Sequence, residues 1–409
     1  MPLFSILTAV FDPEPGHLAA CLSSVDAQTS ADWEHIVVDD CSTRAEISEL
    51  LGGDHDQRRT IIRRVANGGI AAASNDALLA ASGDYVVLLD HDDVLEPAAL
   101  ERMAAAIEAC SPAVAPDVLY SDHDLLRTDG RYASPMYKPV FSPIRLVNHN
   151  YITHLVVIRR GVMQAVGGWR AGFDGAQDHD LLLRLADQGR RFVRVPGVLL
   201  HWRQSPRSVA SSSDNKPEAW ERGVAAVQGH LDRQAIDATA SATEVPGVYR
   251  IRRAVIGRPR VSIIVPTRGS TGRVWGAERI FVQDAVRSVL DAPSAAEFEV
   301  VVVLDAGTDP LVERGLRRIA GDALVTVEVD GPFNFADKIN RGVAASSGSH
   351  LLLLNDDTEL IAAGSVDEML GLAQLPDVGM VGAKLLYADG RLQHGGHVYN
   401  GEISHALLG

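Results

Sequence analysis

Apolar and polar residues alternate in blocks over the N-terminal part of the chain. Runs of consecutive apolar residues predict strands at 4–11, 33–40, 60–65 and 85–90. Ala-rich stretches between them predict helices at 15–28, 45–51 and 70–81. Because each strand is continuously apolar and is followed by a helix, the pattern predicts an α/β fold with a mostly parallel sheet that is covered on both faces.

The chain then repeats itself. Residues 74–93 align without a gap against residues 339–358, and this alignment matches Asp92 with Asp357. Two earlier segments also have later counterparts, which are 4–11 with 261–268 and 35–43 with 300–308. A single copy at this long spacing predicts two domains of one type, 1–256 and 257–409, and not a solenoid of short repeats.

Composition narrows the class of protein. The 409 residues and the 46% hydrophobic content suffice for two cores, and a net charge of −15 argues against a nucleic-acid-coating protein. The three cysteines have neither paired nor metal-ligand spacing, which favours a reducing compartment. We expect neither a signal peptide nor a membrane span, because there is no basic start and no run of about 18 apolar residues.

Three carboxylates follow the strand at 85–90. Asp90, Asp92 and Asp93 repel one another unless a cation joins them, and oxygen ligands suit Mg²⁺ or Mn²⁺. Asp39 and Asp40 end another strand, and the carboxyl ends of parallel strands meet at one edge of a sheet. The alternative is a turn in which aspartates cap the helix that follows. The pattern therefore predicts a cation site at this edge.

Two later segments also carry candidate chemistry. Asp178 stands at the start of a predicted helix, where it is either a general base aimed at a hydroxyl group or a helix cap. His201 is either a nitrogen ligand of the same metal or an ordinary strand-end residue. Arg203 and Arg207 suit the oxygens of a diphosphate.

The order of these segments resembles the family 2 glycosyltransferases with the GT-A fold, in the bacterial subgroup with two such domains in tandem. The resemblance rests on residues 5–11, 37–42, 67–75, 88–93, 175–184 and 201–209. It implies a nucleotide-diphosphate-sugar donor, Mn²⁺ or Mg²⁺, and inverting transfer to a hydroxyl of a saccharide or lipid-linked saccharide. It also implies cell-surface polysaccharide synthesis at the cytoplasmic side of the membrane, with peripheral membrane association left open.

The resemblance also implies roles for individual residues. The implied donor-binding residues are Ala9, Phe11, Asp39, Asp40, Asn67, Asn75, Asp90, Asp92, Arg203 and Arg207. The implied metal ligands are Asp90, Asp92, Asp93 and His201. Asp178 is implied as the catalytic base, with Gln177, Asp180 and Trp202 on the acceptor side. Gln177 departs from the glutamate that the family has at this position.

The second copy differs at the site. It reads Asn355-Asp356-Asp357, so an amide replaces the first carboxylate, while Asp305 matches the nucleoside-side aspartate. Fewer residues follow Thr358 than separate Asp93 from His201 in the first copy. We therefore expect a second domain that lacks its C-terminal acceptor part, as a fragment of a longer protein or as a degenerate domain, and that does not transfer sugar.

Three other functions remain for comparison. The first is a non-catalytic scaffold that binds a nucleotide sugar or a polysaccharide, although pure binding does not require Asp178. A dinucleotide-dependent dehydrogenase is disfavoured because residues 8–16 (TAVFDPEPG) replace the expected Gly-x-Gly-x-x-Gly. A nucleotidyltransferase is disfavoured because no Gly-rich loop with Arg or Lys stands at that place.

Overall fold

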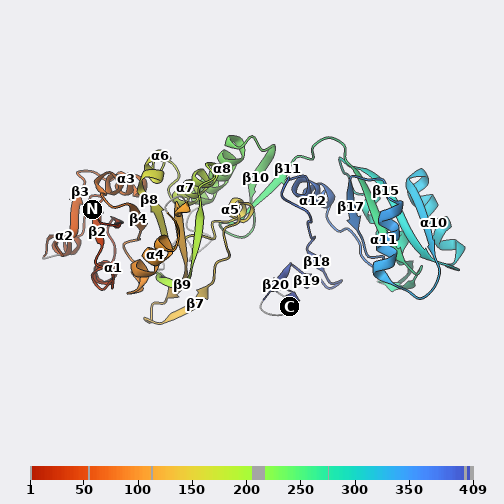
Figure 1. Cartoon of the computed structure of the whole chain (residues 1–409), viewed down its shortest axis with the longest axis horizontal. Coiled ribbons are helices and arrows are strands. Elements are labelled where there is room, and N and C mark those ends of the chain that lie inside the picture. Colours follow the sequence, from red (N-terminus) through yellow and green to blue (C-terminus); the bar gives the residue numbers. More distant parts are fainter. Residues whose placement is uncertain are drawn as a thin grey trace. The chain divides into compact units, whose positions relative to one another are not determined.

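The chain divides into two compact units, Met1–Ile251 and Arg252–Gly409 (Figure 1). A computed structural model describes residues 2–53, 56–111, 114–204, 217–274, 276–399 and 403–405. The boundary predicted after residue 256 lies a few residues beyond this division.

One mixed sheet forms the centre of the first unit. Its strands are β1 (Phe4–Val10), β2 (Trp33–Asp39), β3 (Arg59–Arg63), β4 (Tyr85–Leu88), β5 (Val94–Leu95), β6 (Val118–Leu126), β7 (Tyr132–Met136), β8 (Val156–Arg159) and β9 (Phe192–Arg203). They lie in the order β3-β2-β1-β4-β8-β6-β9-β5, and β7 pairs with β6. The first four strands are parallel, as predicted, whereas β8 runs antiparallel to both β4 and β6.

Helices cover both faces of this sheet. They are α1 (Pro15–Asp26), α2 (Ala45–Gly52), α3 (Ile70–Ala80), α4 (Ala99–Glu108), α5 (Pro143–Asn148), α6 (Arg160–Ala165), α7 (Gln177–Asp187) and α8 (Pro217–Arg233). Successive residues of β1 point to opposite faces, so Leu7 packs in a core with α3, α7 and α8 while Ile6 packs in a core with α1 and α4. A separate two-stranded sheet of β10 (Ala238–Ala242) and β11 (Tyr249–Arg253) follows.

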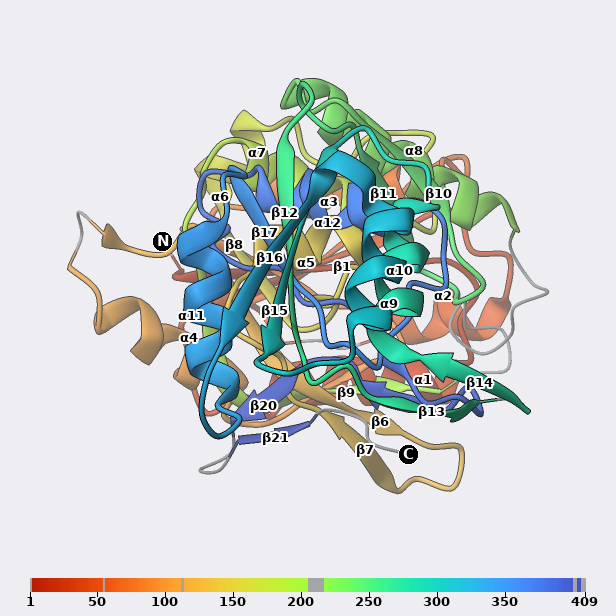
Figure 2. The same cartoon turned by 90° about the vertical axis from the view of Figure 1, so that its right-hand side faces the viewer.

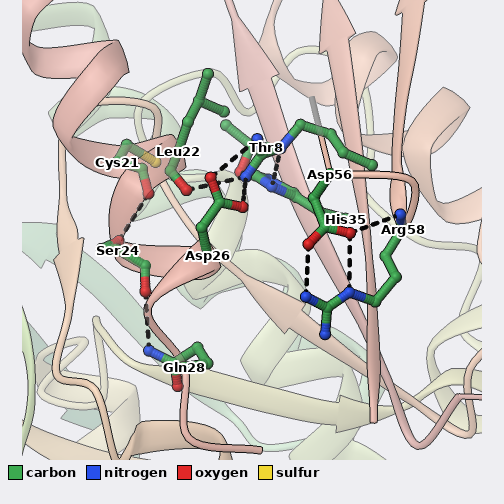
Figure 3. A network of polar contacts seen from close by, with 10 residues as sticks. Thr8, Cys21, Leu22, Ser24, Asp26, Gln28, His35, Asp56 and Arg58 are labelled. Carbon is green, nitrogen blue, oxygen red and sulfur yellow. Dashed lines mark hydrogen bonds and ion pairs between the residues drawn. The ribbon is translucent and has the colours of Figure 1, made fainter. Parts of the chain in front are cut away.

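A buried polar network joins the first two strands to α1. The ring of His35 lies within 3.0 Å of the Thr8 hydroxyl, and its other nitrogen accepts a hydrogen bond from Arg59 at 3.1 Å. Arg59 also donates to the Asp26 carboxylate at 2.7 Å and to the Leu22 carbonyl at 2.9 Å (Figure 3). Because the buried groups Thr8, His35 and Arg59 all have partners, the network fixes the strands whose ends carry the candidate site.

The second unit repeats the first half of this arrangement. Its parallel sheet has the order β16-β15-β12-β17, formed by β12 (Arg260–Thr267), β15 (Glu297–Asp305), β16 (Leu324–Val329) and β17 (His350–Leu353). Its helices are α9 (Phe281–Leu290), α10 (Pro310–Ala320), α11 (Phe335–Ala345) and α12 (Ser365–Ala373), with a short 3₁₀ turn η2 (Gly321–Ala323). Figure 2 shows α11 on one side of the sheet and α9 and α10 on the other.

Short antiparallel pairs complete the second unit. They are β13 (Thr271–Val274) with β14 (Ala277–Ile280), β18 (Leu385–Leu386) with β19 (Leu392–His394), and β20 (His397–Tyr399) with β21 (Ile403–His405). Across the described residues of both units, no helix combines the length and apolar character that crossing a membrane requires.

Candidate active site

The loops after β1 and β2 form one side of the site. Parallel pairing sets Val10 opposite Asp39, so the residues that follow both strands emerge at the same edge. The buried Asp40 carboxylate accepts hydrogen bonds from Arg64 and from the main-chain N–H groups of Gly68, at 2.9 Å, and Gly69, at 2.8 Å. Asp40 therefore holds the loop that leads into α3.

Other polar residues near these strand ends also make local contacts. Asp39 accepts a hydrogen bond from the main-chain N–H of Ser42 at 2.9 Å, and the side chain of Asn67 donates to the Asp40 carbonyl at 3.2 Å. The first strand-end loop is bound to the second through Asp12, whose carboxylate accepts from the main-chain N–H of Thr43 at 2.8 Å. The strand ends are thus organised before any ligand binds.

A cavity of about 770 Å³ opens between these loops and α3. Five of the predicted donor-binding residues line it: Ala9, Phe11, Asp40, Asn67 and Asp90. This volume is in the range of clefts that hold small molecules.

The opposite wall of the cavity was not predicted. Asp174 and Gly175 line it from the loop before α7, and Glu218, Ala219 and Arg222 line it from α8. Gly175 has a positive φ of +87°, and a Cβ there would come within 2.7 Å of the Ala219 side chain. The sequence signalled a helix near residue 217 but gave no sign that this helix reaches the strand ends.

Three potential metal ligands, one of which is Asp90, lie close together. Ligand atoms of Asp90, Asp93 and His154 all lie within 4.8 Å of one another. One oxygen of Asp93 accepts a hydrogen bond from the main-chain N–H of Arg203 at 2.9 Å, while its other oxygen is buried without a hydrogen-bond partner in the described structure. That oxygen is 4.0 Å from Nδ1 of His154. A buried carboxylate oxygen with no donor is suited to a cation.

The pKa values of the three groups also favour a bound cation. Burial, followed by repulsion from Asp92, raises the pKa of Asp90 to about 6, and burial, followed by repulsion from Asp90, raises the pKa of Asp93. Burial lowers the pKa of His154 to about 4, so its imidazole is neutral at physiological pH. Two carboxylates and a neutral imidazole fit a divalent cation such as Mn²⁺ or Mg²⁺.

The structure places the predicted ligand His201 among two other carboxylates. Its Nδ1 lies 2.7 Å from the carboxylate of Asp124 and its Nε2 lies 3.1 Å from the carboxylate of Glu96, while its ring stacks on Tyr132. Both ring nitrogens thus have partners and His201 is not among the three groups that converge, so its role as a metal ligand stays a prediction. His154, which no motif had indicated, is the imidazole that lies in the cluster.

The neighbours of His201 do contact the cluster. Arg203 donates from its side chain to the Asp92 carbonyl at 2.7 Å as well as from its main chain to Asp93. The side chain of Asp92 is not among the three groups that converge. The Trp202 ring lies 5.3 Å from the ring of His154, which places it beside the cluster. Arg207 lies outside the described residues.

Asp178 faces the cluster from the start of α7. It lines a small enclosed cavity of about 30 Å³ together with Asp90 and His154. Its carboxylate accepts hydrogen bonds from the Trp169 indole at 2.9 Å and from the Gln177 amide at 3.3 Å. Burial, with a further contribution from Asp90, raises its pKa and makes it a better proton acceptor. Gln177 lines both cavities.

Two other predicted site residues support the structure from behind. Asp180 is buried and pairs with Arg170 and Arg184, so its carboxylate does not face an acceptor. Asn75 uses both polar atoms on the main chain of Trp169, accepting at 3.0 Å and donating at 2.8 Å. Asn75 therefore positions the tryptophan that holds Asp178, and its contact with a donor stays a prediction.

Residues 5–167, which make up most of the first unit, match the sequence model described as "Glycosyl transferase family 2". This segment is a family 2 glycosyltransferase segment. The α/β fold expected from the sequence is also the fold observed.

Relatives of this family 2 chain are longer. It is 38% identical over 97% of its length to "Uncharacterized protein y4gI" of Sinorhizobium fredii, of which it spans 43%. It is 36% identical over 97% of its length to "O-antigen biosynthesis protein RfbC" of Myxococcus xanthus, of which it spans 30%. Among solved structures, S. aureus TarS 1–349 in complex with UDP-GlcNAc has 18% identity and a TM-score of 0.45, covering 56% of this chain and 66% of TarS 1–349.

Proposed function

We propose that the chain transfers a sugar from a nucleotide-diphosphate sugar to a hydroxyl of a saccharide or lipid-linked saccharide, with inversion at the anomeric carbon. One observation carries the proposal. Asp90 lies in the walls of both cavities, so the open cavity and the carboxylate of Asp178 meet at the same residue. The match to family 2 supports glycosyl transfer as the reaction class. The shared residue Asp90 supports the strand ends as the location of this reaction.

The open cavity would hold the nucleoside and its diphosphate. Ala9, Phe11 and Asn67 line this cavity, and small side chains such as Ala73 on α3 leave space for a ligand. A divalent cation, Mn²⁺ or Mg²⁺, held by Asp90, Asp93 and His154, would neutralise the leaving diphosphate.

Asp178 would act as the general base. The indole of Trp169 and the amide of Gln177 fix its carboxylate, and the raised pKa favours proton uptake. The acceptor oxygen attacks the anomeric carbon while the bond to the diphosphate breaks, and its proton passes to Asp178. A single displacement of this kind inverts the anomeric configuration.

The second unit, in this proposal, transfers no sugar. Asn355 stands where the first unit has Asp90, which leaves one carboxylate fewer for a cation. The relative from Myxococcus xanthus is described as an O-antigen biosynthesis protein, and this supports a proposed role in cell-surface polysaccharide assembly.

A donor panel tests the proposal. UDP-, GDP- and dTDP-sugars are added with and without Mn²⁺, and the melting temperature of the full chain is measured. A bound donor raises the melting temperature by linkage, and we expect Mn²⁺ to be required. Absence of stabilisation across the panel would contradict donor binding. Stabilisation without release of nucleoside diphosphate, with saccharide acceptors supplied, would favour a non-catalytic scaffold.

A further inference from the structure

Lys138 is a buried lysine next to the candidate metal site. It follows β7, and its side chain is only 4% exposed. Its ammonium donates to two main-chain carbonyls, those of Ile152 and His154. Among the described residues it forms no ion pair, and Asp122, which attracts it, is already paired with Arg194.

Such burial is costly. An ammonium removed from water without a carboxylate partner is destabilised, and burial lowers the pKa of Lys138 to about 7. An apolar residue of the same length would avoid this cost. The two hydrogen bonds from the ammonium to main-chain carbonyls therefore indicate a role for Lys138 in fixing this segment of main chain.

The held segment has an unusual conformation. Thr153, between the two bound carbonyls, has a φ of +39°, which a β-branched residue rarely adopts. Its hydroxyl is buried without a partner among the described residues. The carbonyl of His154 also receives a hydrogen bond from the ring of His123 at 3.2 Å. Lys138 thus donates hydrogen bonds to the main-chain carbonyls on both sides of the strained Thr153.

The side chain that this segment presents is the imidazole of the cluster. Nδ1 of His154 lies 4.0 Å from the unpartnered oxygen of Asp93. A turn of the main chain at residue 153 would move the imidazole away from Asp90 and Asp93. Removal of a residue that orients a metal ligand, without itself touching the metal, typically lowers metal affinity by about 10–100-fold.

We propose that Lys138 is a positioning residue, whose ammonium fixes the main chain of residues 152–154 so that His154 completes the divalent-cation site with Asp90 and Asp93. This inference rests on the proposed function, because it concerns the same cation. It adds a residue that touches neither the cation nor the substrate but sets the geometry of one ligand.

The test measures Mn²⁺ binding by calorimetry on the full chain, with no turnover involved. Lys138→Met keeps the length but removes the donors, and we expect about 10–100-fold weaker Mn²⁺ binding. Lys138→Arg restores donors for both carbonyls and should recover most of the affinity. Should Lys138→Met not fold, Lys138→Gln, with one amide donor, replaces it and the same direction is expected.

The second unit offers a matched control. Lys338 is also buried, at 1% exposure, and donates to the main-chain carbonyl of Thr267 at 2.5 Å, but it has no part in the proposed cation site. Lys338→Met should leave Mn²⁺ affinity unchanged. An equal loss of affinity in both variants would show a general effect of removing a buried lysine and would overturn the inference.

Amide hydrogen exchange separates this inference from the proposed function. In Lys138→Met, exchange across residues 150–156 should become faster than in the wild type. Unchanged exchange together with unchanged Mn²⁺ affinity would overturn the positioning role alone. Failure of the wild type to bind Mn²⁺ would instead refute the proposed cation site, and with it the predicted effect on affinity.

Discussion

The two units of the chain carry the same four strands in the same order but fill the space at the strand ends differently. In the first unit Ala73 lines a cavity of about 770 Å³. In the second unit Lys338, the counterpart of Ala73, reaches the strand ends with its ammonium, which pairs with Asp305 at 2.6 Å. Asp305 is in turn the counterpart of Asp40.

The two units also differ in the residues near the strand ends. In the second unit the guanidinium of Arg268 lies 4.4 Å from the ring of Phe333, and the ammonium of Lys338 lies 5.1 Å from the same ring. Asp356 accepts a hydrogen bond from the hydroxyl of Thr267 at 2.6 Å. Internal partners therefore satisfy Asp305 and Asp356 in the second unit, whereas Asp93 in the first unit keeps an unpartnered carboxylate oxygen. A repeated fold does not imply a repeated site.

The largest expected effect concerns Asp178, the proposed general base of the first unit. Asp178→Asn keeps the size and the acceptor for the Trp169 indole but cannot take a proton. Transfer should fall by about 10²–10⁴-fold, the usual contribution of a general base. Donor affinity and melting temperature should stay close to the wild type.

Steady-state turnover at saturating donor measures this effect. Asn is nearly as good a helix cap as Asp, so a capping role predicts surviving activity. Turnover of Asp178→Asn close to that of the wild type would remove Asp178 from the mechanism.

A second change makes the first unit resemble the second. Asp90→Asn copies the amide of Asn355, and we expect Mn²⁺ affinity to fall by more than about 100-fold, since loss of a ligand exceeds loss of its outer partner. Calorimetry with Mn²⁺ measures it, and Asp357→Ala serves as the matched control. Full Mn²⁺ affinity in Asp90→Asn would show that the cation, if bound, lies elsewhere.

The pH dependence follows from the raised pKa of Asp90. This carboxylate must lose its proton to bind a cation, so Mn²⁺ affinity should rise through about pH 6, by up to about tenfold per pH unit for one proton. Without metal the sign reverses. The folded pKa of about 6 exceeds the ordinary 3.8, so stability should fall between about pH 4 and pH 6.

Both measurements have the same control. Asp90→Asn lacks the titrating group, so its metal-free melting temperature should vary less over this pH range. A wild-type Mn²⁺ affinity that is flat from pH 5 to pH 7 would mean that Asp90 is ionised throughout this range and would contradict the prediction.

The smallest effect is expected in the second unit. Asp357→Ala removes the counterpart of Asp92, and transfer should stay within about twofold of the wild type, as for most surface changes away from a site. Activity assays on this variant, and on its combination with Asp178→Asn, give the comparison. A large further loss in the combined variant would assign residual turnover to the second unit.

The sequence predicted the parallel half of the first sheet well. Continuous apolar runs at 4–11 and 33–40 became β1 and β2, and the Ala-rich run at 70–81 became α3. The mixed half was not predicted, because β6 pairs with β8 and β9 across long stretches of chain. Local periodicity does not encode such pairings.

The candidate site could be predicted where a polar residue coincides with the end of an element. Asp90 and Asp178 stood out because a carboxylate after a strand or at a helix start is conspicuous, and the structure places both on one cavity. His154 could not be predicted to join them, since it lies in the loop before β8 and only the tertiary fold brings it beside Asp93. The sequence also gave no sign that His201 contacts Asp124, because Asp124 lies on the neighbouring strand β6.

We propose that the chain has one nucleotide-sugar site and that Asp90 belongs to it. Calorimetric titration of the full chain with the stabilising nucleotide in the presence of Mn²⁺ tests this proposal directly. We expect about one nucleotide bound per chain, and binding too weak to measure in Asp90→Asn. Two nucleotides per chain, or undiminished binding in Asp90→Asn, would contradict it.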